Sequence, residues 1–272
     1  MTFRNHTVGA AAAAGASEEP QAFNPKEDFI NRPRIRDIGR WHVTNFVKFA
    51  SESLPAGTSI LDAGAGECAY KEYFSHCGYV SVDLAIGEDR WNYNNLDYIA
   101  PLDNLPFADA SFDAVLSTQV LEHLEYPREA VKELFRVLKP GGKLFLTAPM
   151  AHSEHQAPYD FFRYTSYGLK SICKQAGFGE IIITPLGGLF TRWAYEIPRI
   201  IALFPSAGLK KGRIRFKGFM LLPLRGVCFL AVRLTQMVFL CLDRFDKEKK
   251  FPFGWSLTAQ KSGFKSKSGA AV

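Results

Sequence analysis

The sequence predicts an α/β fold built on a mostly parallel sheet, and two observations support that prediction. An apolar run ends at Leu61, and it is followed by a turn with two glycines and by a helix-compatible segment, residues 69–74. A strand, a glycine turn and a helix in this order form the first half of a βαβ unit. A second apolar run, residues 80–84, comes next and carries Asp83 near its end. Asp62 stands in the corresponding place, directly after Leu61.

The segments around this unit continue the alternation of helix and strand. Helical spacing of apolar residues between Pro25 and Ser53 predicts a lead-in helix. Residues 113–117 follow a turn-forming stretch and are predicted to be a short buried strand. Apolar residues three and four positions apart indicate a helix over residues 130–138, which Pro140-Gly141-Gly142 is expected to end before another strand begins.

The glycine turn between two acids indicates a nucleotide-binding crevice. Gly64 and Gly66 let the backbone turn tightly against a ligand, and with Ala69 they fit a dinucleotide pattern in which Asp83 binds a ribose. Asp62 is an anion next to the place where a pyrophosphate would lie, so it favours a cationic ligand. S-adenosylmethionine carries an ammonium and a sulfonium but no phosphate. Asp62 is therefore expected to receive its amino group, and Asp83 its ribose hydroxyls.

Three later motifs resemble those of one enzyme family. They are Leu105-Pro106-Phe107 through Ser117, Val120-Leu121-Glu122-His123-Leu124, and Arg136 through Leu144. With the glycine turn, they are similar over residues 59–149 to the class I S-adenosylmethionine-dependent methyltransferases of type 11. The resemblance implies a Rossmann-like fold of seven strands in the order 3-2-1-4-5-7-6, with helices on both faces and the last strand antiparallel. The sixth and last strands usually form a near-direct hairpin in this family, so the residues between them here are expected to be a helical insertion.

The resemblance also implies further contacts to the cofactor. Residues after the third strand contact adenine in this family, so Asp103 is expected to bind the adenine amino group and Leu102 to pack on the ring. Ser117, in the fourth strand, is placed among the cofactor-binding residues as well. The chain departs from the family at Cys68, where a third glycine is common, and a small thiol is compatible with binding.

The loop 152–165 is expected to hold the acceptor site, because ligands of open parallel sheets lie beyond the carboxyl ends of the strands. A hydroxyl acceptor must lose a proton, and His155 or His152 is a candidate base, with Asp160 orienting it. The alternative is that both histidines only line the loop. Arg163 either holds an anionic group of the acceptor or pairs with Asp160.

The remaining candidates of the acceptor site are less specific. Tyr159 and His123 are expected to contact the substrate, although a helix-capping or packing role for Glu122 and His123 is favoured, since an acid in a first turn suits the helix dipole. A metal is not expected, because His152 and His155 lack further ligands at suitable spacing.

A basic and apolar insertion, residues 190–250, is predicted between the sixth and the last strand. It carries thirteen Lys and Arg against four acids, a net charge of +9, whereas the whole chain carries +6. No apolar run approaches the ~18 to 20 residues that cross a bilayer, so an amphipathic helical hairpin on an anionic membrane surface is expected. The alternatives are a packed helical cap or a dimer contact. The apolar runs argue against nucleic acid as a partner.

The composition predicts one domain with an elaboration rather than two independent domains. A methyltransferase core, residues 26–189, is expected before the insertion, and the last strand, residues 251–261, after it. The tails, residues 1–25 and 262–272, are predicted to be disordered. The five cysteines show no spacing typical of a metal site or a redox pair, which predicts reduced thiols in a cytoplasmic protein. The insertion would bring this protein to the inner face of a membrane.

The predicted function is methyl transfer from S-adenosylmethionine to a hydroxyl of a lipid-linked or surface-glycan-related acceptor. Two other classes use the same features. An NAD-dependent oxidoreductase would share the glycine turn, and a non-catalytic binding protein with this fold would keep the sheet and the cofactor site.

Overall fold

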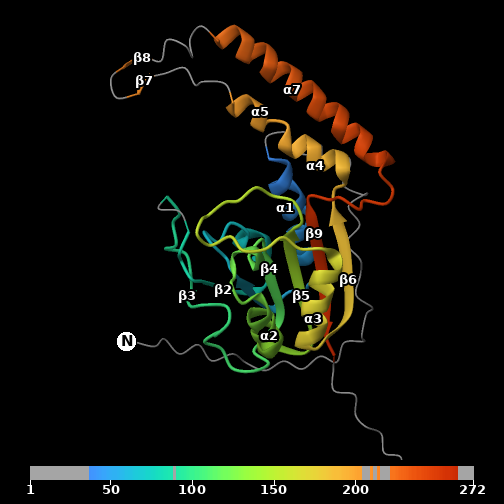
Figure 1. Cartoon of the computed structure of the whole chain (residues 1–272). Helices are drawn as coiled ribbons and strands as arrows, with labels where there is room; N and C mark the ends of the chain where they lie inside the picture. Colours follow the sequence, from blue (N-terminus) through green and yellow to red (C-terminus); the bar gives the residue numbers. More distant parts are fainter. Residues whose placement is uncertain (1–36, 88–89, 204–208, 211–212, 215–220, 263–272) are drawn as a thin grey trace, which may run out of the picture.

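The computed structural model describes residues 37–262, apart from 88–89, 204–208, 211–212 and 215–220. This part of the chain is built on a seven-stranded sheet in the order β3-β2-β1-β4-β5-β9-β6 (Figure 1). β9 is antiparallel to both neighbours, and the other pairs are parallel. The predicted strand order and Rossmann-like class are therefore confirmed. The predicted tails, 1–25 and all but the first residue of 262–272, lie outside the described residues.

Strands and helices alternate along most of the core. The strands are β1 Ser59–Ala63, β2 Gly78–Asp83, β3 Tyr98–Ile99, β4 Phe112–Thr118, β5 Leu138–Pro149, β6 Phe178–Leu186 and β9 Gly254–Lys261. The helices are α1 Ile38–Glu52, η2 Lys71–Phe74, η3 Leu121–His123, α2 Pro127–Val137 and α3 Ser166–Ala176. The segment expected to form the first crossover helix is thus reduced to the short 3-10 helix η2.

Each face of the sheet is covered by its own helices. Ile60, Leu116 and Phe145 are buried in one cluster with apolar residues of α1, and Leu61 and Val115 are buried in the other cluster with residues of α2 and α3. Neighbouring residues of a strand point to opposite faces, so Ile60 and Leu61 separate into the two layers. Burial on both faces explains why these strands read as continuous apolar runs.

The end of α2 differs from its prediction. The helix begins with Pro127 in its first turn, which suits a residue without an N–H. It ends at Val137, before the predicted stop at Pro140-Gly141-Gly142. Leu138 is fully buried and pairs with Phe112 of β4, so the backbone already runs in β5 there. Sheet pairing therefore ends the helix ahead of the proline.

The insertion lies between β6 and β9, as predicted, and it extends away from the sheet (Figure 1). Its elements are α4 Leu189–Glu196, α5 Arg199–Ala202, β7 Leu209–Lys210, β8 Arg213–Ile214, α7 Leu222–Leu242 and η4 Asp243–Phe245. The expectation that no apolar segment is long enough to cross a membrane is wrong. Leu222–Phe245 passes that test by length and composition, because Arg225 and Arg233 interrupt the apolar sequence without breaking the helix.

One end of α7 is tied to the start of α4. The Asp243 carboxylate accepts hydrogen bonds from the backbone N–H groups of Gly188 and Thr191, at 3.1 and 2.8 Å. Farther along α7, the Gln236 side chain donates to the carbonyl of Ala194 at 2.7 Å. Val232 and Gln236 are the buried residues of α7, and most of its other side chains remain accessible. The helix is therefore anchored along a narrow stripe.

Candidate active site

A cavity of about 590 Å³ opens at the carboxyl ends of β1, β2 and β4. This is the edge at which ligands of open α/β sheets bind. Side chains from α1, from the loop 152–165 and from α4 complete its walls. One half of the cavity contains the glycine turn, and the other contains a cluster of histidines with a buried glutamate.

The glycine turn has the conformation that its composition predicts. Gly64 and Gly66 have φ values of +85° and +52°, in the left-handed region that favours glycine. A Cβ at Gly64 would also overlap the side chain of Val120. Cys68, at the position where the family often has glycine, is left-handed too, with φ of +57°. The turn therefore presents bare backbone to the cavity.

Asp62 is the most unusual group of this half. Its side chain lines the cavity and is 1% exposed. Oδ2 accepts a hydrogen bond from the Tyr79 hydroxyl at 2.6 Å, whereas Oδ1 has no hydrogen-bond partner among the described residues. Burial raises the pKa of Asp62 to about 7. A buried polar atom without a partner is costly, so this oxygen is suited to an incoming ammonium group.

Asp83 braces the turn from the next strand. Oδ2 accepts from the backbone N–H of Gly66 at 3.0 Å, and Oδ1 accepts from Ala85 N–H at 2.8 Å. These bonds fix the carboxylate at the cavity wall. A carboxylate has about four acceptor sites, so it can still accept hydrogen bonds from two ribose hydroxyls.

The other predicted cofactor-binding residues divide into two groups. Leu102, which is buried, and Asp103 both line the cavity. Ser117 is buried within β4 and, in the described part of the chain, is not part of the lining. The cavity is lined instead by Thr118 and Gln119, because β4 reaches the cavity only at its carboxyl end.

Two aromatic residues of this half were not predicted. Trp91 and Tyr93 line the cavity, and their ring centroids lie 6.2 Å apart. The Tyr93 hydroxyl accepts from the backbone N–H of Gly87 at 2.6 Å, which fixes the segment after β2. The pair of aromatic residues soon after Asp83 was the available sequence signal.

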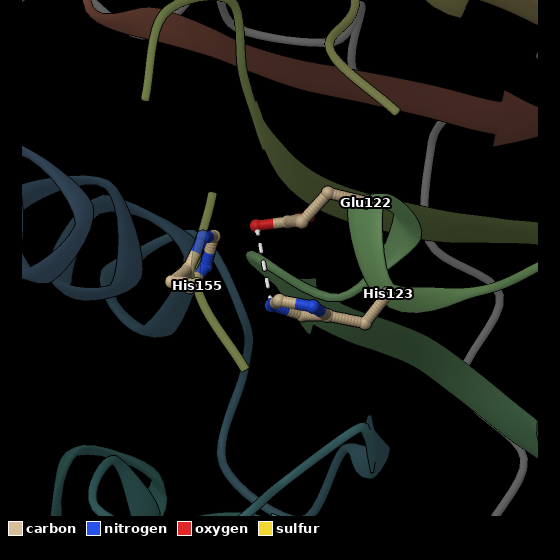
Figure 2. A group of neighbouring side chains, drawn as sticks. All are labelled: Glu122, His123 and His155. Atoms are coloured by element: carbon tan, nitrogen blue, oxygen red, sulfur yellow. Dashed lines mark ion pairs between the residues drawn. The ribbon is translucent and has the colours of Figure 1, made fainter. Parts of the chain in front are cut away.

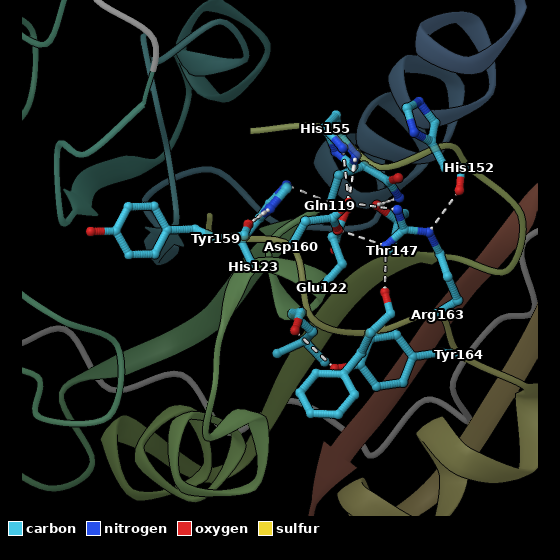
Figure 3. Close-up of polar contacts among 12 residues, drawn as sticks. Gln119, Glu122, His123, Thr147, His152, His155, Tyr159, Asp160, Arg163 and Tyr164 are labelled. Carbon is cyan, nitrogen blue, oxygen red and sulfur yellow. Dashed lines mark hydrogen bonds and ion pairs between the residues drawn. The ribbon is translucent and has the colours of Figure 1, made fainter. Parts of the chain in front are cut away.

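The half of the cavity that contains the histidines brings together residues that are far apart in the sequence (Figure 3). His123, His152, His155 and Tyr159 all line the cavity. The ring centroids of His123 and His155 are 4.7 Å apart, and those of His152 and His155 are 4.3 Å apart. Burial lowers the pKa of each of these three histidines, which favours neutral imidazoles.

Asp160 and Arg163 hold the loop rather than facing the cavity. Arg163 donates two hydrogen bonds to the Asp160 carboxylate, at 2.7 and 2.8 Å, and these hold the pKa of that carboxyl well below its usual range. Arg163 also donates to the carbonyls of His152 and Ser153, each at 3.0 Å. Of the two alternatives for Arg163, the structure shows the ion pair.

Asp160 does approach His155, as the prediction of an orienting acid requires. Its Oδ2 accepts from the backbone N–H of His155 at 2.9 Å and lies 3.4 Å from Nδ1 of the same residue. Asp160 therefore fixes the position of the His155 ring through the backbone as well as the side chain.

Glu122 does not cap α2, so of the favoured capping or packing role only packing agrees with the structure. It lies in η3, whereas α2 begins only at Pro127 with Tyr126 at its N-cap. The Glu122 side chain is 1% exposed, and burial raises its pKa to about 8. Oε1 lies 4.0 Å from Nε2 of His123 (Figure 2). The carboxyl group thus belongs to the wall of the cavity.

Comparisons with known proteins agree with this geometry. Residues 61–146 match the family model of a methyltransferase domain. The chain is 35% identical over 111 residues to a tRNA (carboxymethyluridine(34)-5-O)-methyltransferase of Arabidopsis thaliana, covering 38% of this chain and 27% of that protein. It is 34% identical over 159 residues to a demethylmenaquinone methyltransferase of Renibacterium salmoninarum, covering 54% of this chain and 63% of that one. The chain thus spans less than two thirds of the length of these relatives.

A solved structure supports the fold. The crystal structure of the [4+2]-cyclase SpnF matches with a TM-score of 0.50 and 17% identity, over 82% of this chain and 84% of that chain. The residues that match the family model include the glycine turn, Asp83 and the Glu122-His123 pair. Residues 61–146 therefore form a methyltransferase domain of the class I S-adenosylmethionine-dependent kind.

Proposed function

We propose that the protein transfers a methyl group from S-adenosylmethionine to a hydroxyl of a lipid-linked or surface-glycan-related acceptor. The observation that carries the proposal is the bare, buried Oδ1 of Asp62 beside two left-handed glycines. A phosphate ligand would meet this carboxylate with repulsion, whereas an ammonium satisfies it. When bound, S-adenosylmethionine supplies an electrophilic methyl group on a sulfonium.

The residues of the first half would hold the cofactor in the family's manner. Asp62 receives the amino group and Asp83 the ribose hydroxyls. Leu102 packs against the adenine, and the Asp103 carboxylate accepts a hydrogen bond from the adenine amino group. All four line the same cavity, which supports the assignment.

The histidine half would hold the acceptor. In the transfer, the bond between carbon and sulfur breaks with its electron pair on sulfur, a bond between carbon and the acceptor oxygen forms, and the hydroxyl proton must leave. His155 suits this task better than His152. Nδ1 of His152 faces the Ser153 carbonyl at 2.7 Å, and its Nε2 is 2.7 Å from the Tyr195 hydroxyl. Nε2 of His155 has no hydrogen-bond partner in the described part of the chain.

The class of acceptor is supported by α7. Val227 and Leu230 are 68% and 61% exposed, and other large apolar residues of the helix are nearly as accessible. So much exposed apolar surface is typical of a binding face. Only 17% of the apolar window is buried, which favours the membrane over the alternative of a packed cap. We infer that α7 lies in the anionic surface on the inner face of a membrane. The basic residues of the insertion would then lie near the lipid headgroups.

The cavity and α7 are connected through α4, which supports delivery of a lipid-linked acceptor. Tyr195 of α4 lines the cavity and bonds His152. Trp193 of the same helix packs against Phe239 of α7, with centroids 5.6 Å apart. A lipid bound along α7 would therefore be held close to the histidine half.

The cofactor is tested by titrating S-adenosylmethionine and NADH against tryptophan fluorescence. Trp91 lines the cavity, so we expect S-adenosylmethionine to change the emission and the Trp91→Phe variant to lose most of that change. A response to NADH alone would favour the oxidoreductase instead.

Membrane binding is tested by sedimentation with vesicles of anionic and of neutral phospholipid. We expect pelleting with anionic vesicles, and weaker pelleting for Val227→Asp/Leu230→Asp. The matched control is Tyr167→Asp, which alters an exposed apolar residue of α3, 84% accessible. Equal recovery of all proteins in the supernatant would contradict the membrane proposal. A screen of lipid extracts with radiolabelled methyl donor then identifies the acceptor.

A further inference from the structure

We propose that Glu122, His123 and His155 form a binding site for a divalent transition-metal ion of the zinc class, at the acceptor end of the cavity (Figure 2). One carboxylate and two imidazoles are a donor set that such ions prefer. One ligand atom from each residue lies within 4.8 Å of the other two. The spacing around His152 and His155 in the sequence offers no further ligands, whereas the fold brings Glu122 and His123 to His155 from η3.

The Glu122 carboxylate is the first support for this site. The side chain is 1% exposed, and its Oε2 has no hydrogen-bond partner among the described residues. Leaving a polar atom of this kind buried and unpaired costs free energy, which a bound cation would recover. Figure 2 shows the carboxylate pointing toward the two imidazole rings.

The tautomers of the two histidines are the second support. Nδ1 of His123 lies 2.6 Å from the carbonyl oxygen of Tyr159, and Nδ1 of His155 lies 3.1 Å from that of Ser153. A carbonyl only accepts, so each Nδ1 carries the proton and each Nε2 keeps a free lone pair. Metal-binding histidines are oriented in this way by a backbone carbonyl behind the ring. His152 uses both ring nitrogens in hydrogen bonds and is excluded as a ligand.

To bind an ion, the ligand atoms of these three residues must move slightly closer together. Oε1 of Glu122 is 4.0 Å from Nε2 of His123, whereas the ligand atoms of tetrahedral zinc lie roughly 3.4 Å apart. Rotation of the Glu122 and His123 side chains would close that spacing. His155 is carried on a loop, so rotation of its side chain can close its own spacing to the other two ligand atoms, which is at most 4.8 Å. All three residues line the cavity, which leaves an open coordination position toward the acceptor, as in catalytic zinc sites. That role, holding the acceptor oxygen, rests on the proposed function, and with the ion bound it would replace proton removal by His155, whose Nε2 lone pair would be on the metal. The site itself does not rest on the proposed function.

The test is metal binding by the full chain without an affinity tag. The protein is stripped with EDTA, and Zn²⁺ is titrated in competition with a chromogenic chelator. Co²⁺ is added separately, and its visible spectrum reports the ligand geometry. We expect one ion per chain, and an affinity lower by at least about tenfold in Glu122→Gln and in His155→Asn.

Two histidine variants serve as controls. His76→Asn alters a histidine outside the cavity, whose ring contacts the Leu54 carbonyl, and His152→Asn alters the neighbouring ring that is not a ligand. Both should bind Zn²⁺ as the unmodified chain does. Circular dichroism shows whether each variant is folded, and His155→Asn, on a loop, keeps the test decisive if Glu122→Gln unfolds.

Failure to bind one ion, or unchanged affinity in folded Glu122→Gln and His155→Asn, would overturn the metal site. Fluorescence titration of the stripped protein with S-adenosylmethionine separates the two proposals. Cofactor binding without zinc binding overturns the metal site alone and leaves His155 as the base. Zinc binding without cofactor binding overturns the proposed function alone.

Discussion

At the scale of single residues, the cofactor half depends on Asp62, whose pKa burial raises to about 7. The ammonium of S-adenosylmethionine binds the ionised carboxylate, so affinity should fall as the pH drops below about 7. Asp62→Asn should weaken binding by about 1.5 to 3 kcal/mol near pH 8 and remove this pH dependence. Fluorescence titrations between about pH 5.5 and 8.5 measure how the cofactor affinity changes with pH. Asp103→Asn is the control and should keep the same pH dependence. A pH-independent affinity in the unmodified chain would contradict the role of Asp62.

The glycine turn gives a second prediction at this scale. Gly57 and Gly64 have similar φ values, +81° and +85°, but a Cβ at Gly57 meets no atom within 4 Å, whereas one at Gly64 overlaps Val120. Gly57→Ala should cost about 1 to 2 kcal/mol of unfolding free energy and leave cofactor affinity unchanged. Gly64→Ala should cost more and also weaken cofactor binding. Urea unfolding and fluorescence titration of both variants make the comparison, and equal cofactor affinities would count against the turn as the binding backbone.

At the scale of elements, the stability of the insertion rests on the join between α4 and α7. Asp243 is buried, accepts two backbone hydrogen bonds and pairs with Lys249 at 2.6 Å. Asp243→Ala should therefore destabilise the protein by about 2 to 4 kcal/mol. Glu248→Ala, which removes an ion pair whose side chains are more than 70% exposed, should change stability by less than about 1 kcal/mol. Urea unfolding measures the free energy of unfolding of both variants. Equal losses in the two would show that other contacts anchor α7.

The elements also show which kinds of pattern predict structure well. Apolar strands and the amphipathic spacing of α2 were predicted because local periodicity encodes them. The insertion was predicted to be helical, but not the unbroken length of α7. Arg225 and Arg233 divide its sequence into shorter apolar runs, although arginine is a good helix former. The end of α2 was misplaced, because pairing of Leu138 with Phe112 is a contact between distant segments.

At the scale of the whole molecule, the cofactor half of the site could be predicted and the acceptor half only in part. Asp62, Gly64 and Asp83 lie in two consecutive strand ends, so sequence spacing alone places them together. Glu122 meets His155 because η3 and the loop 152–165 close over the same cavity, and no local pattern encodes that approach. The burial of Glu122, which distinguishes it from a helix cap, is likewise a property of the assembled fold.

The most direct measurement for the whole molecule is a crystal structure with S-adenosylhomocysteine. The predicted result is a ligand in the cavity, with its amino group within hydrogen-bonding distance of Asp62 and both ribose hydroxyls on Asp83. A ligand bound elsewhere, or one whose amino group avoids Asp62, would contradict the assignment of this cavity to the methyl donor.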